Sequence, residues 1–342
     1  STNAMAGDIQ INGPGVLEVL AGRTIDLGTG ANFIDGTGVG ISSIGNNRNP
    51  NLPFAGADLI VLAGVSSPDG KGPALGLSFS SLDIETFTEN YLKKPEAFDS
   101  VYREKLGKKY QQLSAEQQAV VALEKFYKVL RKAGRDAAET GSYKPGYKAI
   151  KTLFGKAKPL GDILTRAREI RTTSGGSISL GVPGGDIRMA SEIFGNPLTP
   201  PGVVTEYGGS VSTFTDGNVD IGQARIFTLR GGDITMWSSN GNIAAGSSPR
   251  TVVTAPPTRV LIDISSADIQ TDLGGLATGG GIGVLATVVG VRPGNVDLIA
   301  PIGAVDAGDA GIRATGNLNI AAAVVLNAAN ISVGGTSAGA AA

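Results

Sequence analysis

The sequence contains no cysteine and no histidine among its 342 residues. These absences exclude a disulfide framework, a thiolate nucleophile, the Ser-His-Asp and Cys-His pairs of many hydrolases, and imidazole metal ligands. Aromatic residues are also scarce, at 5%. No run reaches the roughly 18 to 20 apolar residues of a membrane helix, and the N-terminus lacks a basic region followed by an apolar run. We therefore expect no membrane span, no export signal and no cofactor in this sequence.

The composition indicates a folded chain. Hydrophobic residues make up 41% of the sequence, and the net charge is only −1. A chain that can bury this much aliphatic surface at so low a charge is not expected to be disordered. Glycine is abundant, with 51 residues, but it shows no G-X-Y period, which excludes a collagen-like structure.

A short phrase recurs along the chain: a turn-forming pair followed by an apolar, a polar and an apolar residue, as in Gly217-Asn218-Val219-Asp220-Ile221. Copies begin at Gly7, Gly176, Gly185, Gly232, Gly294 and Gly316, with weaker ones at Ala267 and Ala329. Each copy predicts a turn that leads into a strand too short to bury a face alone. When such strands stack coil upon coil, each buries its apolar residues against the equivalent strands above and below, so the repeat predicts a right-handed parallel β-helix. An antiparallel sandwich with glycine-rich turns is the alternative, but the scarcity of aromatics favours the solenoid.

Residues 82–170 differ from the rest of the chain. They hold 18 basic and 12 acidic residues, and 10 of the 18 aromatic residues. We interpret them as an α-helical insertion with its own core, between a first β-helix part at 5–81 and a second at 171–334. Residues 335–342 are expected to be a disordered tail. Residues 1–4, which precede Met5, are typical of a cloning remnant, and we expect the chain to be part of a longer protein.

Three helices are expected within the insertion. Pro95 suits a first helical position, and apolar residues follow it at helical spacing up to Leu106. Ser114 and Gln117 form a capping box that begins a second helix, for which Gly134 is the expected C-terminal stop. A third helix is expected from Tyr147 to about Phe154.

The basic side chains of the insertion are candidates for partner binding. With two tyrosines, the candidate set is Lys105, Lys108, Lys109, Lys128, Arg131, Lys132, Tyr143 and Tyr147. Such a face could bind an anionic glycan, a lipid head group or nucleic acid. It could equally be the solvated side of amphipathic helices. Of these partners we expect a glycan, or else a protein receptor, and no nucleic acid.

Carboxylates are the remaining candidates for catalysis. Glycoside hydrolysis needs two of them facing one groove, and the outward-facing candidates are Asp220, Asp233, Asp263, Asp268 and Asp297. Each lies in a repeated strand or turn, where a solvated Asp is expected without any catalytic role. The residues that follow the repeat glycines alternate among Asp186, Ser177 and Asn218, which is typical of turns and not of a calcium-ligand series. We therefore predict no catalytic and no metal site.

The insertion and its flanks resemble the filamentous haemagglutinin family. The motifs, in order, are FTENYL at 87–92, FYKVLRKAGR at 126–135, YKPGYKAIKTLF at 143–154, GDI at 161–163 and IRTTSGGSISL at 170–180. The segment ADLIVLAGV at 57–65 is also similar to the family pattern. The resemblance extends from about residue 50 to 335, and the ordered set is more specific than any single motif.

This resemblance implies a very long exoprotein of a Gram-negative bacterium. Such proteins leave the cell by two-partner secretion through an outer-membrane pore, fold as right-handed β-helices and act as adhesins in virulence. The resemblance implies a secreted or cell-surface location and a non-catalytic segment that mediates attachment to host cells or surfaces. The family's secretion domain is not visible here, and no Arg-Gly-Asp triplet is present. We expect specific binding on the insertion and not on the repetitive shaft.

Overall fold

A computed structural model describes most of the chain. The described residues are 8–30, 37–46, 49, 51–92, 108–155, 160–189, 200–247, 259–263, 268–272, 279–287 and 290–339. The first predicted helix of the insertion, from Pro95 to Leu106, lies outside them.

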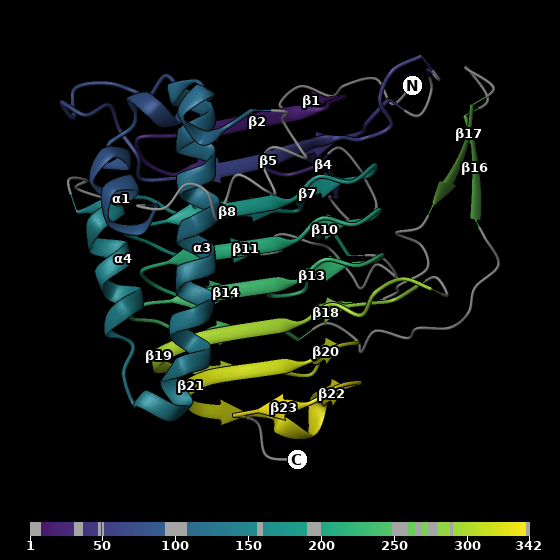
Figure 1. The fold of residues 1–342 in the computed structure, drawn as a ribbon. Helices are drawn as coiled ribbons and strands as arrows, with labels where there is room; N and C mark the ends of the chain where they lie inside the picture. Colours follow the sequence, from purple (N-terminus) through teal and green to yellow (C-terminus); the bar gives the residue numbers. More distant parts are fainter. Residues whose placement is uncertain are drawn as a thin grey trace.

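The chain winds through stacked coils that have three faces (Figure 1). The first face contains β1 (Ile9–Ile11), β4 (Gly38–Ser43), β7 (Arg168–Thr172), β10 (Gly202–Thr205), β13 (Arg225–Thr228), β18 (Gly281–Val284), β20 (Ile312–Ala314) and β22 (Ile331–Val333). The second contains β2 (Gly15–Leu20), β5 (Ala57–Leu62), β8 (Ile178–Val182), β11 (Val211–Thr215), β14 (Ile234–Ser238) and β23 (Ser337–Ala338). The third contains β3 (Ile25–Asp26), β6 (Ile163–Arg166), β9 (Ile187–Met189), β12 (Val219–Asp220) and β15 (Ile243–Ala244). Two long strands, β19 (Val296–Asp306) and β21 (Leu318–Leu326), bend across the second and third faces.

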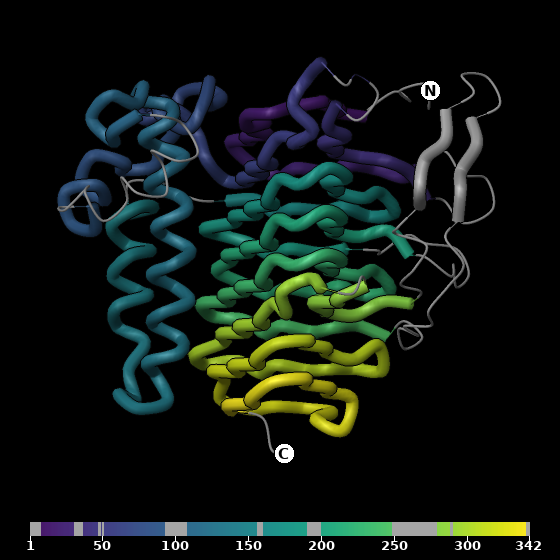
Figure 2. The backbone as a smooth tube through the Cα atoms, turned by 45° about the vertical axis from the view of Figure 1, so that its right-hand side comes forward, coloured from purple at the N-terminus to yellow at the C-terminus, as the bar shows by residue number. Residues whose placement is uncertain are grey.

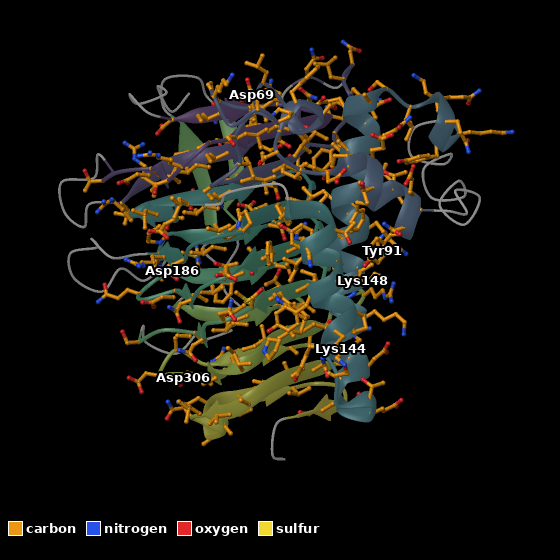
Figure 3. All side chains as sticks on the ribbon, turned by 90° about the vertical axis from the view of Figure 1, so that its left-hand side faces the viewer. Asp69, Tyr91, Lys144, Lys148, Asp186 and Asp306 are labelled. Atoms are coloured by element: carbon orange, nitrogen blue, oxygen red, sulfur yellow. The ribbon has the colours of Figure 1, made fainter. Side chains whose placement is uncertain are left out.

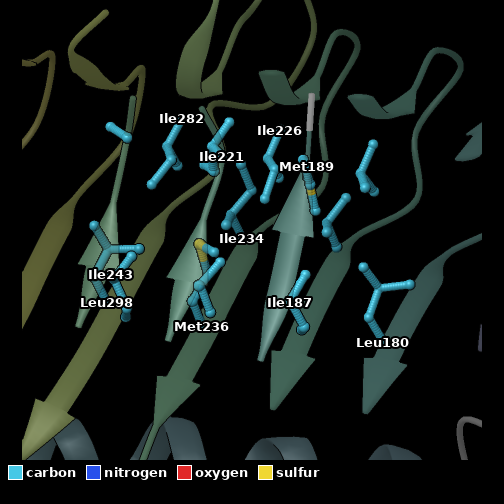
Figure 4. Packing of buried hydrophobic residues seen from close by; sticks show 14 of the residues in the cluster. Leu180, Ile187, Met189, Ile221, Ile226, Ile234, Met236, Ile243, Ile282 and Leu298 are labelled. Atoms are coloured by element: carbon cyan, nitrogen blue, oxygen red, sulfur yellow. The ribbon is translucent and has the colours of Figure 1, made fainter. Parts of the chain in front are cut away.

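Every strand of these faces pairs with its neighbours in parallel, which confirms the predicted parallel β-helix. Equivalent residues of successive coils lie in register, so the interior consists of aliphatic columns. On the first face, one column contains Ile41, Ile170, Val203, Ile226, Ile282 and Ile312. These side chains are all buried, and Figure 4 shows part of the same cluster. The narrow interior explains why a sequence so poor in aromatics still has a continuous core.

The polar residue after each repeat glycine connects one coil to the next. Asp58 Oδ1 accepts the Ser177 N–H at 2.7 Å, and Asp233 Oδ1 accepts the Asn295 N–H at 2.9 Å. Oxygens of Ser177, Ser210, Asn295 and Asn317 continue this series on the corner before the second face. A second series, through Asp162, Asp186, Asn218 and Asn242, lies before the third face. The alternation of Asp, Ser and Asn in the sequence therefore reflects backbone hydrogen bonding between coils.

Glycine precedes these polar residues because the coils approach closely there. Gly232 has φ of 92°, and a Cβ added to it would lie 1.9 Å from the Gly209 carbonyl oxygen. Any other residue would therefore be strained and would also clash with the coil before it.

The helices lie between β5 and β6, in the second coil. They are α1 (Ile84–Tyr91), α3 (Ala115–Thr140) and α4 (Lys144–Phe154), with short 3-10 turns η1 (Leu77–Phe79) and η2 (Tyr110–Gln112). A further 3-10 turn, η4 (Ala328–Asn330), lies between β21 and β22. The Ser114 capping box is present, and α4 begins three residues before the expected start. Figure 2 shows α3 and α4 side by side, running along the solenoid axis.

The predicted stop at Gly134 is wrong. Helix α3 continues to Thr140 and ends at Gly141, which adopts the left-handed conformation. Gly134 is instead a point of close packing against β19, because a Cβ there would lie 2.3 Å from Ile299 Cγ1. The glycine thus lets the helix approach the sheet.

The prediction that the insertion has a core of its own is also wrong. The second hydrophobic cluster joins helical residues such as Phe126 and Leu130 to outward-facing residues of the second face. The solenoid contributes a column that runs through Leu62, Gly181, Phe214, Trp237, Ile299 and Ala321. The helices and the second face therefore share one apolar layer, separate from the solenoid interior.

Three segments differ from the arrangement expected from the sequence. The second part of the β-helix was predicted to begin at residue 171, but strands β6 and β7, at 163–172, already belong to the coils. The weaker repeat copy at Ala267 is not part of a coil, because β16 (Arg259–Asp263) and β17 (Asp268–Asp272) form an antiparallel hairpin. Ser337 and Ala338, in the expected tail, pair with β21.

Candidate functional site

The predicted partner-binding residues divide into two groups. Lys105 lies outside the described residues. Lys108 and Lys109 are exposed before η2, and Lys128 and Lys132 are exposed on α3. Lys132 also pairs with Asp136 one helical turn on, at 2.6 Å.

The other three predicted residues face the solenoid. Arg131 pairs with Asp233 at 3.0 Å. Tyr143 and Tyr147 contact the edge of Trp237, with ring centroids 6.2 and 5.6 Å away, and burial raises the pKa of both phenols. The Tyr147 hydroxyl donates to the Ser239 carbonyl at 2.7 Å. These three side chains contact the solenoid, and their role in partner binding stays a prediction.

Two cavities lie on the helical side of the molecule. One, of about 340 Å³, is lined by Asn90, Tyr91, Lys144, Pro145 and Lys148. Figure 3 shows Tyr91, Lys144 and Lys148 on this side of the molecule. The other, of about 480 Å³, lies between the N-terminal ends of α1 and α3 and is lined mainly by polar residues, including Asp83, Glu85 and Glu89. Lys144 and Lys148 were not among the predicted partner-binding residues, although both follow Tyr143 within the same motif.

Two of the candidate catalytic aspartates, Asp233 and Asp297, make structural contacts with α3. Asp297 is fully buried on β19 and accepts two hydrogen bonds from Arg135, at 2.7 and 2.8 Å. Burial raises the pKa of Asp297, and Arg135 and Arg131 offset only part of this increase. Asp233 lies beneath Arg131, so α3 covers this pair of carboxylates with two guanidinium groups.

The remaining aspartates are not brought together with that pair. Asp220 is exposed, and its Oδ1 accepts the Gly222 N–H in a turn at 3.0 Å. Asp263 and Asp268 belong to the β16–β17 hairpin, and their side chains lie outside the described residues. Within the described part of the chain, no group of three or more acidic residues is arranged to hold a metal ion.

The structure reveals a carboxyl pair that the sequence did not indicate. Glu18 on β2 accepts the Leu77 N–H at 3.1 Å, and Glu116 in the first turn of α3 accepts the Ser78 hydroxyl. Burial is the main cause that raises the pKa of Glu18 to about 7. The hydrogen bond with Glu116 and the negative charge of Glu116 raise it in the same direction. For Glu116, burial is outweighed by hydrogen bonds from Ser78, Glu18 and the backbone, so its pKa is lowered. The two residues are 98 positions apart, and nothing in either local sequence links them.

This pair predicts a pH-dependent stability. The pKa of Glu18 is raised above its ordinary 4.5 on folding, so the protonated form stabilises the protein below about pH 4.5, and this contribution is lost as the pH rises through about 7. We expect the free energy of unfolding to fall by about 1–2 kcal/mol between pH 5 and 8, since the pair is partly solvated. Glu18→Gln should remove this dependence, whereas Glu139→Gln, at the far end of α3, should keep it. Urea unfolding at several pH values measures both, and an unchanged pH profile in Glu18→Gln contradicts the assignment.

A match to a known family lies in the C-terminal third of the chain. Residues 231–342 match the family model described as filamentous haemagglutinin family outer membrane protein. This match confirms the resemblance recognised in the sequence. The haemagglutinin-family segment comprises β14 and the coils that follow it, together with the β16–β17 hairpin, and it does not include the helices.

No curated protein and no solved structure matches the chain. None of the described helices is both long enough and apolar enough to cross a membrane. The outward side chains of the haemagglutinin-family segment nevertheless meet the insertion, through Asp233, Trp237, Asp297 and Ile299. The matched segment and the helices are therefore linked by packing and by ion pairs.

Proposed function

We propose that this chain is a non-catalytic structural and interaction segment of a large exported adhesin that attaches to host cells or surfaces. The observation that carries the proposal is that the family match coincides with solenoid coils: apart from the β16–β17 hairpin, the described strands of the matched segment, from β14 to β23, form parallel stacked coils. A secreted or cell-surface location and export of the full protein through an outer-membrane pore belong to the same proposal.

The fold suits a rigid spacer. Each coil bonds to the next through strand pairing on its faces and through the Asp, Asn and Ser side chains at the corners. Coils that contact only their neighbours can be stacked to any length, so such a shaft gives reach while it presents a repetitive surface.

The insertion supplies less repetitive chemistry. Lys108, Lys109, Lys128 and Lys132 are exposed on it, and Lys144 and Lys148 line a cavity nearby. We place binding of a host glycan or protein receptor on these basic residues of the insertion, because exposed cations attract anionic partners.

An attachment assay tests this placement. The double variant Lys128→Gln/Lys132→Gln should attach to host cells less well than the parent at low salt, and the difference should shrink as salt screens the charges. The matched control is Lys71→Gln/Arg188→Gln, which removes two exposed cations outside the insertion. Equal attachment of the two variants contradicts binding on the insertion.

The same protein tests the enzymatic alternative, a β-helix polysaccharide lyase or glycoside hydrolase that uses paired aspartates. Incubation with acidic and neutral polysaccharides should give no cleavage. Turnover abolished by a single Asp→Asn change would replace the adhesin proposal with an enzyme.

A further inference from the structure

Two exposed aromatic residues, Phe54 and Tyr207, lie together at one corner of the solenoid. Among the described residues, the aromatic side chains with large exposure are Phe54 at 51%, Phe79 at 60% and Tyr207 at 38%. Phe54 and Tyr207 contact each other edge to face, with ring centroids 5.6 Å apart. Both lie between the first and second faces, Phe54 after β4 and Tyr207 after β10.

These two rings come from coils that are not adjacent. The coil between them has Ser174 and Gly175 at the same corner, and a Cβ on Gly175 would lie 3.4 Å from the Tyr207 carbonyl oxygen. Ser174 is buried, and its carbonyl accepts the Gly56 N–H from the Phe54 loop at 2.8 Å. Because the middle coil presents no large side chain here, Phe54 reaches Tyr207 across it.

An arginine completes the group from the next coil. The Arg230 guanidinium carbon lies 4.2 Å from the centroid of the Tyr207 ring, which is a close cation–π contact. The backbone of Arg230 is held in place by a bridge to Ala286 and by the Thr287 N–H, which donates to the Leu229 carbonyl at 3.1 Å. The guanidinium is therefore presented by a fixed corner of the fold.

Within the described part of the chain, this guanidinium lacks a carboxylate. Its Nε is buried without a hydrogen-bond partner, and no ion pair joins Arg230 to a described residue. The nearby Glu206 does not supply one, because it is buried and pairs with Arg171. By contrast Arg131, Arg135 and Arg166 each pair with an aspartate.

We propose that Phe54, Tyr207 and Arg230 form a binding site for a carboxylated glycan, a chain of hexuronic acid sugars. The guanidinium fork matches a carboxylate, to which it can donate two parallel hydrogen bonds. The exposed parts of the two rings offer an apolar surface for the C–H groups of a pyranose. Arg292, exposed at the same corner in the following coil, provides a second cation for the next uronate along the corner.

The inference names a ligand class for the adhesin function proposed above and rests on it for its biological purpose. It places this site on the shaft corner, away from the lysines of the insertion. The binding itself is measured on the purified full chain, so it can fail while cell attachment persists.

Isothermal titration with an oligogalacturonate is the primary measurement. Its methyl ester, which keeps the sugar shape and removes the charge, should bind at least about tenfold more weakly, because charge-assisted hydrogen bonds are roughly twice as strong as neutral ones. A sulfated oligosaccharide and an oligoglutamate of similar length are the other probes. Both should bind more weakly than the uronate, the first because it lacks carboxylates and the second because it lacks sugar rings.

Four variants assign the site. Arg230→Gln should weaken uronate binding about tenfold or more, and Arg230→Lys should not restore it fully, since an ammonium lacks the planar fork. Tyr207→Ala and Phe54→Ala should each weaken binding severalfold. The matched control Lys71→Gln removes an equal charge from an exposed loop after β5, outside both this corner and the insertion, and it should bind like the parent. Circular dichroism melting of each variant separates loss of binding from loss of folding.

Several results would overturn the proposal. These are a parent that binds no uronate, equal binding of the methyl ester, or full binding by Arg230→Gln. An equal loss of binding in Lys71→Gln would show that any exposed cation serves, and it would contradict this site. Tighter binding of the sulfated probe would replace the carboxylate assignment, and tighter binding of oligoglutamate would indicate an acidic protein partner. A parent that attaches to cells but binds no uronate rejects this site and leaves the adhesin proposal standing.

Discussion

Arg135→Ala is expected to destabilise the protein by about 2–3 kcal/mol at neutral pH, because a buried carboxylate loses its hydrogen-bond donors while Arg135 itself is half exposed. Asp297 is fully buried, and Arg135 donates to both of its carboxylate oxygens. Without Arg135, a desolvated carboxylate remains, with only Arg131 nearby to oppose the effect of burial on its pKa. Urea unfolding followed by circular dichroism measures the change.

The pH dependence of that variant gives an independent check. Removal of the guanidinium raises the pKa of Asp297 further above its ordinary 3.8, so the folded state binds a proton that the unfolded state has lost. The destabilisation should therefore be smaller at pH 5 than at pH 8. Addition of Asp297→Asn should recover part of the loss, because the amide carries no charge. Lys132→Ala breaks an exposed pair on the same helix and should cost less than about 1 kcal/mol. Equal costs for Arg135→Ala and Lys132→Ala would contradict a structural role for the buried pair.

Trp237→Ala is expected to cost about 3–5 kcal/mol, as do other truncations of large buried aromatics. Trp237 is fully buried between Phe214 and Ile299 in the outward column of the second face. Its indole N–H donates to Ser239 Oγ at 3.1 Å, and α4 packs so closely on it that a Cβ on Gly146 would lie 2.3 Å from the ring. The truncation leaves a cavity at the contact between the helices and the solenoid.

Unfolding is followed by circular dichroism and not by tryptophan fluorescence, because the variant has lost the only tryptophan in the chain. Limited proteolysis should also cleave α3 or α4 faster in the variant, since both helices lose part of their contact. Phe79→Ala is the matched control: its ring is 60% exposed, so little stability should be lost. A Trp237 variant as stable as the Phe79 variant would show that the helices do not depend on this contact.

The features that the sequence predicts correctly depend on local chemistry. The capping box needs only Ser114 and Gln117, three residues apart, and it begins α3 as expected. The coils follow from a phrase in which a turn residue and two inward apolar residues lie within five positions. In such patterns all the interacting residues lie within a few positions, so they can be identified without knowledge of residues distant in the sequence.

The features that were wrong or missed depend on distant contacts. Gly134 has the composition of a helix stop, but its neighbour is Ile299, and only that contact explains the absent side chain. The contact of Arg131 with Asp233, 102 residues away in the sequence, has no signal in the local pattern around either residue. The many aromatic residues of the insertion suggested an independent core. The strand residues that complete this hydrophobic cluster face outward and are spread over six coils, so the sequence shows no local sign of them.

The hydrogen bonds at the corners have a direction. In both series the side-chain oxygen belongs to the earlier coil and the donating N–H to the later one, from Asp58 and Ser177 through to Asn317 and Thr336. A coil that has folded therefore presents acceptors to the coil that follows it in the chain, and not to the coil before it. The same coil presents backbone N–H donors on its other side, toward the side-chain acceptors of the coil that precedes it. The two ends of a stack of coils are therefore chemically different, since one ends in side-chain acceptors and the other in backbone donors.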